Sequence, residues 1–195
     1  MVVSDKPTLW RRLWATPAAR WCLGIPLGGV LAFVLGMAAL AGFHGVLGYT
    51  NSNGFCYRCH QGMDSIVAEY QASPHFHNTK GVVAATCSDC HVPRELLPKL
   101  WLKIRATKDI YLRLRGEITP DNFELEHRAR LAAISTAEFR ESDSRNCRYC
   151  HDPARMDLAN QSRSAARRHQ GMAERGESCI DCHAGIAHQL PTQQE

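Results

Sequence analysis

The chain has 195 residues, which is enough for a membrane anchor and one modest domain but too few for several large domains. Lys plus Arg exceed Asp plus Glu by only four, and four basic residues lie before position 50. The rest of the chain is therefore close to neutral. This balance argues against a nucleic-acid-binding protein.

The first predicted element is a membrane-spanning helix over residues 21–45. From Trp21 to Phe43 no residue carries a formal charge, and 23 such residues are long enough to cross a bilayer with some tilt. The basic residues before this run are Lys6, Arg11, Arg12 and Arg20. By the positive-inside rule, we expect residues 1–20 in the cytoplasm and residues 50–195 in the periplasm, so that the chain crosses a bacterial inner membrane once.

A cleaved signal peptide is the alternative interpretation of this run. The small residues of Ala39-Leu40-Ala41 resemble a cleavage site. However, the apolar run is longer than the usual hydrophobic region of about 7–15 residues, which favours an uncleaved anchor.

Four CxxCH motifs follow the anchor. They lie in FCYRCH, TCSDCH, NCRYCH and SCIDCH, and their residues are Cys56, Cys59 and His60; Cys87, Cys90 and His91; Cys147, Cys150 and His151; and Cys179, Cys182 and His183. Each motif is typical of covalent haem c attachment, because two thiols at this spacing reach the two vinyl groups of one porphyrin and the histidine then lies beneath the iron. Structural zinc is the alternative, but a histidine in the same place in all four motifs favours four haems.

The spacing of the motifs indicates an internal repeat. Cys56 and Cys87 are 31 residues apart, and Cys147 and Cys179 are 32 residues apart. This predicts two dihaem modules, over about residues 54–92 and 145–190, joined by a helical linker over residues 93–144. The expected fold is mainly α, with a haem-packed periplasmic domain at residues 50–195 in which the porphyrins supply much of the buried apolar surface.

Two helices are predicted in the linker. In residues 93–116 apolar side chains recur at helical spacing among basic residues, and a second helix is expected over residues 123–140. The first helix fits a basic amphipathic helix lying on anionic lipid of the inner membrane. The alternative is an ordinary core helix with a solvated basic face.

The remaining histidines are candidates for the second axial ligands of the haems. His75 and His169 occupy equivalent places between the motifs of the two modules, and His188 lies five residues beyond His183. Three strong histidine candidates for four haems imply that one haem differs from the others in its axial ligands. Met63, three residues after His60, is the candidate there, because a thioether also ligates haem iron. The alternative for Met63 is a flexible packing residue.

The order of these features resembles the NapC/NirT family of membrane-anchored multihaem cytochromes c. The resemblance covers nearly the whole chain and lies in the anchor, NGFCYRCH, TCSDCHVP, the basic linker helix, NCRYCH and CIDCHAGIAHQLP. The last of these and TCSDCHVP are much more specific than CxxCH alone.

The resemblance implies roles for particular residues. It assigns His188 to the second haem, His169 to the third and His75 to the fourth. The family uses methionine in place of the motif histidine at its first, quinone-facing haem, usually two residues after that histidine. Met63 is three residues after it, so either Met63 or His60 is expected as the ligand.

The resemblance also implies a quinone site, with Lys103 near the quinone and Asp109 as a carboxylate near the first haem. A carboxylate there is able to accept a proton that quinol releases on oxidation. The alternative for Asp109 is an exposed salt bridge with Arg105 or Arg113.

The sequence as a whole predicts a tetrahaem cytochrome c that passes electrons from the membrane quinol pool to a periplasmic nitrate, nitrite or other reductase, or to a soluble cytochrome. Its substrate is then quinol, and its activity that of a quinol dehydrogenase. The alternatives are reverse flow from a periplasmic oxidation such as that of hydroxylamine to quinone, a tethering subunit of a stable complex or homo-oligomer, and catalysis at an open haem iron.

Overall fold

The structure is a computed structural model, and it describes residues 8–17, 24–60, 62–77 and 83–191. These residues form helices joined by turns and loops, and no β-strand occurs among them. The mainly helical fold expected from the sequence is confirmed. The described chain divides into two units. The first ends at Thr50 and the second begins at Asn51.

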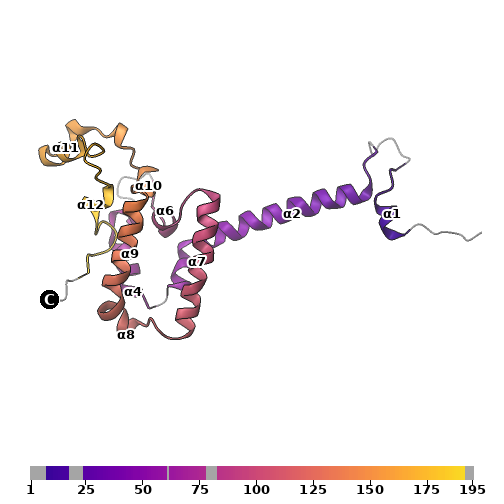
Figure 1. Cartoon of the computed structure of the whole chain (residues 1–195), viewed down its shortest axis with the longest axis horizontal. Coiled ribbons are helices and arrows are strands. Elements are labelled where there is room, and N and C mark those ends of the chain that lie inside the picture. The colour runs from indigo at the N-terminus through magenta and orange to yellow at the C-terminus, as the bar shows by residue number, and fades with distance from the viewer. Residues whose placement is uncertain (1–7, 18–23, 61, 78–82, 192–195) are drawn as a thin grey trace, which may run out of the picture. The chain divides into compact units, whose positions relative to one another are not determined.

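The first unit contains α1 (Leu9–Leu13) and α2 (Leu27–Tyr49) (Figure 1). Pro26 precedes α2, and its fixed φ suits a position at a helix start. Throughout its 23 residues α2 is uncharged and almost wholly exposed, and among the described residues it is the one helix long and apolar enough to cross a membrane. The helix begins and ends later than the predicted span of 21–45, and residues 18–23 lie outside the described residues.

The second unit is built from short helices around two long ones (Figure 1). The short elements are α3 (Asn53–Cys59), α4 (Asp64–Ala72), α5 (Pro74–His77), α6 (Cys87–His91), α8 (Pro120–Asn122), α10 (Arg145–Arg148), two 3₁₀ turns (Pro153–Arg155 and Leu158–Asn160), α11 (Arg163–His169) and α12 (Cys179–His183). The long helices are α7 (Leu96–Leu114) and α9 (Arg128–Glu141), and a π-helical turn, η2 (Phe123–His127), leads into α9.

The long helices confirm the two linker helices predicted from the sequence. Leu97, Trp101 and Ile104 follow one another at helical spacing on α7, and all three are exposed. No residue of α7 is buried against other described residues. Arg105 of α7 forms an ion pair of 3.8 Å with Glu138, which connects α7 to α9.

The second unit has a very small side-chain core. Among the described residues only Tyr70, Phe123 and Met172 are buried apolar side chains. Phe123 is 2% exposed and lies where α8 passes into the π-helical turn. Because a domain of this size normally buries many more apolar residues, this unit needs another source of buried apolar surface.

Phe123→Ala removes the largest fully buried side chain and is expected to destabilise the second unit by about 3–5 kcal/mol. Leu125→Ala is the matched control, because Leu125 lies on the same turn but is 70% exposed. Thermal unfolding of the detergent-solubilised protein, followed by circular dichroism, measures both. Equal shifts in Tm for the two variants would contradict this placement of the core.

Candidate functional site

Each CxxCH motif lies on or beside a short helix. Cys56 and Cys59 lie on α3, Cys87 and Cys90 on α6, Cys147 on α10 with Cys150 just after it, and Cys179 and Cys182 on α12. Residues three and four apart face the same side of a helix, so each turn presents two thiols and the following histidine together. None of these eight cysteines forms a disulfide.

The helices of the second and fourth motifs begin with the same capping arrangement. The Thr86 N–H donates to Asp89 and the Ser178 N–H donates to Asp181, each at 2.8 Å, and each aspartate N–H in turn faces the capping side chain. The aspartate in CSDCH and CIDCH therefore fixes the local helix start. A hydrogen bond from Arg140, and further bonds from Ser178, lower the pKa of Asp181 to about 2.

Hydrogen bonds connect the motifs to one another in chain order. The Cys87 N–H donates to Asn53 Oδ1 at 2.9 Å, Asn146 Nδ2 donates to the Cys90 carbonyl at 2.7 Å, and the Ile180 N–H donates to Ser144 Oγ at 3.1 Å. In each case a side chain just before one motif binds the backbone of a neighbouring motif. The four motifs therefore form a continuous series from first to fourth.

Three histidine pairs lie at similar separations. The ring centroids are 6.3 Å apart for His91 and His188, 6.1 Å for His75 and His151, and 6.0 Å for His169 and His183. With a metal–nitrogen bond of about 2 Å, as imidazole makes with zinc, two rings on opposite sides of one iron have centroids about 6 Å apart. No second histidine ring pairs with His60 in the part of the chain that the structure describes.

Two of these pairs differ from those that the resemblance implied. His188 faces His91 of the second motif, as expected, but His75 faces His151 of the third motif and His169 faces His183 of the fourth. These ring pairs differ from the assignment of His169 to the third haem and His75 to the fourth. His75 crosses from the first half of the repeat to the second, so the structure does not confirm two separate dihaem modules.

In two of these histidines, the ring nitrogen Nδ1 lies within hydrogen-bond distance of an oxygen atom. His188 Nδ1 lies 3.1 Å from the Ile66 carbonyl, and His169 Nδ1 lies 2.6 Å from Gln161 Oε1. A proton on Nδ1 leaves Nε2 as the free donor atom for a metal, which is how histidine ligands are commonly oriented. His75 Nδ1 is buried without a hydrogen-bond partner.

Local burial also favours the neutral form of these rings. Desolvation lowers the pKa of His91 to about 4, and desolvation lowers the pKa of His75 and of His188 as well. Neutral imidazole is the form that binds a metal ion.

The residues present fit covalently attached haem. Eight cysteines outside any disulfide, paired histidines at the separation set by one metal ion, and a core of three apolar side chains among the described residues all fit apolar cofactors bound between the helices. The third motif also borders a cavity of about 590 Å³, whose lining includes Cys150, His151 and Met156. This volume lies within the range of about 300–1,000 Å³ typical of ligand pockets.

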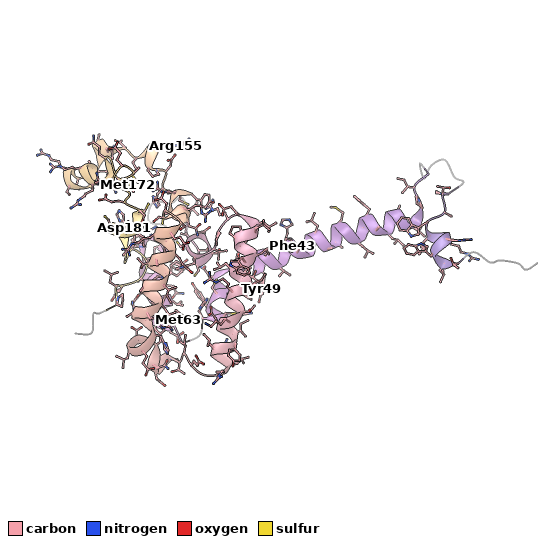
Figure 2. All side chains as sticks on the ribbon, in the orientation of Figure 1. Phe43, Tyr49, Met63, Arg155, Met172 and Asp181 are labelled. Atoms are coloured by element: carbon pink, nitrogen blue, oxygen red, sulfur yellow. The ribbon has the colours of Figure 1, made fainter. Side chains whose placement is uncertain are left out.

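Met63 lies beside the first motif and caps the start of α4 (Figure 2). Its N–H donates to the His60 carbonyl at 3.4 Å, and its side chain is half-buried. Gly62 adopts a φ of +91°, and a Cβ there would lie 3.2 Å from the Thr119 carbonyl carbon. The extra residue before Met63 is thus a glycine in a left-handed turn that a larger residue would strain.

Helix α7 brings Lys103 to the first motif. Burial lowers the pKa of Lys103. The nearby Cys56 opposes this shift in pKa but does not cancel it. Arg113 Nη1 donates to the Arg58 carbonyl within that motif at 2.6 Å. Asp109 is exposed on the same helix, four residues before Arg113, while Arg105 pairs with Glu138.

An ion-pair cluster around Arg128 was not foreseen from the sequence. Arg128 is 7% exposed and bonds Glu69 and Glu124. Burial opposes the charged form, but the two carboxylates raise the pKa of Arg128 overall. The spacing of Glu124 and Arg128 indicates an i,i+4 pair, whereas nothing in the sequence points to Glu69, 59 residues away.

A sequence model of the NapC/NirT cytochrome c family, N-terminal region, matches residues 20–193. The chain belongs to this family. It is 40% identical over 194 residues to the cytochrome c-type protein NapC of Escherichia coli, which covers 97% of the chain and 94% of that protein. It is 39% identical over 176 residues to the denitrification system component NirT of Stutzerimonas stutzeri, covering 90% and 86%.

A putative tetraheme cytochrome c of Allochromatium vinosum is 50% identical over 145 residues, which covers 74% of the chain and 77% of that protein. No solved structure matches the chain. As a NapC/NirT cytochrome, the protein carries covalently bound haem c and a membrane anchor, for which α2 is the candidate helix.

Asn53→Ala is expected to destabilise the second unit by about 1–3 kcal/mol, because it leaves the partly buried Cys87 N–H without a partner. Asn160→Ala removes an exposed bond to Asp157 and is expected to cost under about 0.5 kcal/mol. Denaturant unfolding of the holoprotein compares the two. A negligible effect at Asn53 would show that this contact between the first two motifs is unimportant.

Proposed function

We propose that this chain is a membrane-anchored tetrahaem cytochrome c that carries electrons from the membrane quinol pool to a periplasmic reductase. The observation that carries the proposal is the set of three histidine pairs at 6.0–6.3 Å, each including one motif histidine, within a continuous series of four motifs. The names NapC and NirT belong to similar proteins, and the second is described as part of a denitrification system.

The bound haems would supply one-electron redox chemistry, and the residues of the chain would hold them in series. The cysteines of each motif would bind one porphyrin. His91 with His188, His151 with His75, and His183 with His169 would then ligate the second, third and fourth irons, as their ring separations favour. Met63 or His60 would serve the first.

The first motif is the proposed entry point for electrons. Quinol oxidation releases two protons, and Asp109 would accept one of them. Lys103 of α7, which lies near Cys56 of α3, would hold a quinone oxygen. Both residues belong to α7, which also bears the exposed Leu97, Trp101 and Ile104.

The charges before α2 and the side chains of α7 support electron entry at the first motif. Arg11 and Arg12 precede α2 and favour a cytoplasmic amino terminus, which would put the haem domain in the periplasm. The apolar and basic side chains of α7 fit the interfacial region of anionic inner-membrane lipid. The first motif, which α7 contacts through Arg113, would then lie where quinol is concentrated.

The periplasmic partner would be a redox enzyme or soluble cytochrome that accepts electrons near the fourth motif. A homo-oligomer or a stable complex with that partner is compatible with the same route. No nucleic acid is involved.

Asp109→Asn is expected to slow reduction of the oxidised protein by quinol, on the order of 10²-fold if the carboxylate is the proton acceptor. Anaerobic stopped-flow mixing with a menaquinol and a ubiquinol analogue, followed at the haem absorbance, measures the rate. Asp121→Asn on α8 is the control, because Asp121 is another exposed aspartate that lies outside α7.

Rapid reduction of the wild type and of Asp121→Asn, with slow reduction of Asp109→Asn, is the expected result. Equal rates in all three proteins would remove Asp109 from the site. No reduction by either quinol would contradict electron entry from the quinol pool and favour reverse flow or a passive tether.

The histidine pairing is tested by double variants. Because His75 faces His151, replacing both with glycine is expected to perturb one haem in four, whereas replacing His75 and His183 is expected to perturb two. Carbon monoxide bound per reduced protein, in excess of that bound by the wild type, counts the haems that have lost a ligand. The opposite result, with two haems perturbed in the first variant and one in the second, would restore the pairing implied by the resemblance.

A further inference from the structure

His188 lies in a segment without regular secondary structure. Helix α12 ends at His183, and the following residues, up to the end of the described chain at Pro191, form turns and bends. By contrast, His75 and His169 each lie within a helix. A ligand on an irregular carboxyl-terminal segment needs support from elsewhere, because a metal ligand must be held to within about 0.5 Å.

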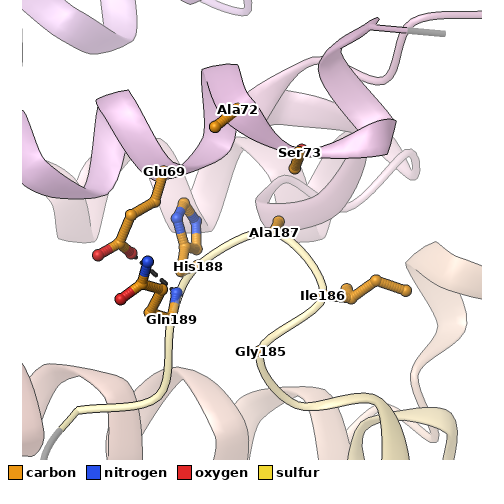
Figure 3. A pocket seen from close by; sticks show the side chains of 8 residues that line it. All are labelled: Glu69, Ala72, Ser73, Gly185, Ile186, Ala187, His188 and Gln189. Carbon is orange, nitrogen blue, oxygen red and sulfur yellow. Dashed lines mark hydrogen bonds between the residues drawn. The ribbon is translucent and has the colours of Figure 1, made fainter. Parts of the chain in front are cut away.

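Helix α4 holds this segment at two points one helical turn apart (Figure 3). The Ile66 carbonyl lies 3.1 Å from His188 Nδ1, and Glu69 Oε2 accepts a hydrogen bond of 2.8 Å from the Gln189 N–H. The imidazole ring and the next peptide group are therefore fixed to the same helix. This helix also borders a cavity of about 160 Å³, whose lining includes Glu69, Ser73 and His188.

Arg128 holds the carbonyl of the same residue, Gln189, from the side of α9. Its Nη2 donates to the Gln189 carbonyl at 2.9 Å and to both oxygens of Glu69 at 2.7 and 2.8 Å. Gln189 directly follows His188. Its backbone N–H and its backbone carbonyl are thus both bonded to one buried ion pair. The Arg128 side chain is 8% exposed and that of Glu69 is 15% exposed, so water competes weakly for these bonds.

Arg128 is itself held in place. Its Nη1 donates to the Glu124 carboxylate at 3.0 and 3.1 Å, and Ser65 of α4 also donates to Glu124. Glu124 lies in the π-helical turn η2, and such turns occur often at functional sites. The guanidinium fork therefore connects α4, the π-helical turn and the carboxyl-terminal segment.

We propose that Arg128 and Glu69 form a positioning pair that fixes His188 as the distal ligand of the second haem. The proposal rests on the ligand assignment made above for His91 and His188, which lie 6.3 Å apart. Neither Arg128 nor Glu69 touches the iron. They act through the backbone N–H and carbonyl of Gln189. Loss of either side chain leaves the segment that carries His188 held by fewer hydrogen bonds.

The test is the spin state of the oxidised, detergent-solubilised holoprotein. In Arg128→Ala we expect a high-spin ferric signal by electron paramagnetic resonance, and carbon monoxide binding after reduction, that exceed those of the wild type by at most one haem in four. His188→Gly defines the full increase, and added imidazole should return both variants to the wild-type signal. Haem content and circular dichroism confirm that four haems and the helices remain.

Two milder substitutions refine the test. Arg128→Lys keeps the charge but cannot bond Glu69, Glu124 and Gln189 at once, so its high-spin fraction should lie between those of the wild type and Arg128→Ala. Glu69→Gln keeps the size of the side chain but loses the ion pair. If Arg128→Ala does not assemble, these two variants decide the question.

Arg130→Ala is the matched control. Arg130 lies on the same helix, is exposed, and makes a 3.5 Å contact with His127, so this variant should show no high-spin signal beyond that of the wild type. If the Arg128 and Glu69 variants also show no high-spin signal beyond that of the wild type, even with a lower Tm, the proposal is overturned, because a purely structural pair lowers Tm without freeing the iron.

The outcomes separate this proposal from the ligand assignment beneath it. If His188→Gly remains low-spin, His188 is not the ligand and both statements fail. If His188→Gly becomes high-spin while the Arg128 and Glu69 variants do not, only the positioning pair fails. Neither result depends on whether quinol is the electron donor.

Discussion

The arrangement of the haem domain depends on pairs of histidine rings held 6.0 to 6.3 Å apart. Two of the pairs, His75 with His151 and His91 with His188, join segments far apart in the sequence. In an ordinary domain a side-chain core makes such long-range connections, but here only three buried apolar side chains occur among the described residues. Covalently bound haem is therefore part of what holds the helices together as well as the source of redox chemistry.

The polar contacts complete this framework. Side chains of Asn53, Ser144 and Asn146 bond the backbone of neighbouring motifs, so that the attachment sites follow one another from first to fourth. The Arg128 and Glu69 pair performs a related task for the irregular segment that carries His188. In the proposed function this order gives electrons a route from the side of α7 to the side of α11 and α12.

Local features were predictable from the sequence because they depend on neighbouring residues. The apolar helix, the two linker helices and the turns that carry the CxxC pairs all follow from composition and spacing. The resemblance of CIDCHAGIAHQLP and TCSDCHVP to the NapC/NirT family added the family membership that the sequence model later confirmed. The partner of His91 also agreed with the expectation.

Contacts between distant segments were not predictable in the same way. The resemblance assigned His169 to the third haem and His75 to the fourth, but the fold brings His75 to the third motif and His169 to the fourth. Similarly, Glu69, Arg128 and Gln189 are ordinary polar residues in the sequence. Their common role arises only when α4, α9 and the carboxyl-terminal segment pack together.

The most direct measurement is near-infrared magnetic circular dichroism of the fully oxidised, detergent-solubilised protein, with its covalent haem content determined in parallel. It distinguishes paired-imidazole ligation from other ligand sets at each low-spin iron. The account predicts four covalent haems, three with two imidazole ligands and a first haem that differs. Fewer than four haems, or four haems with identical paired-imidazole ligation, would contradict it.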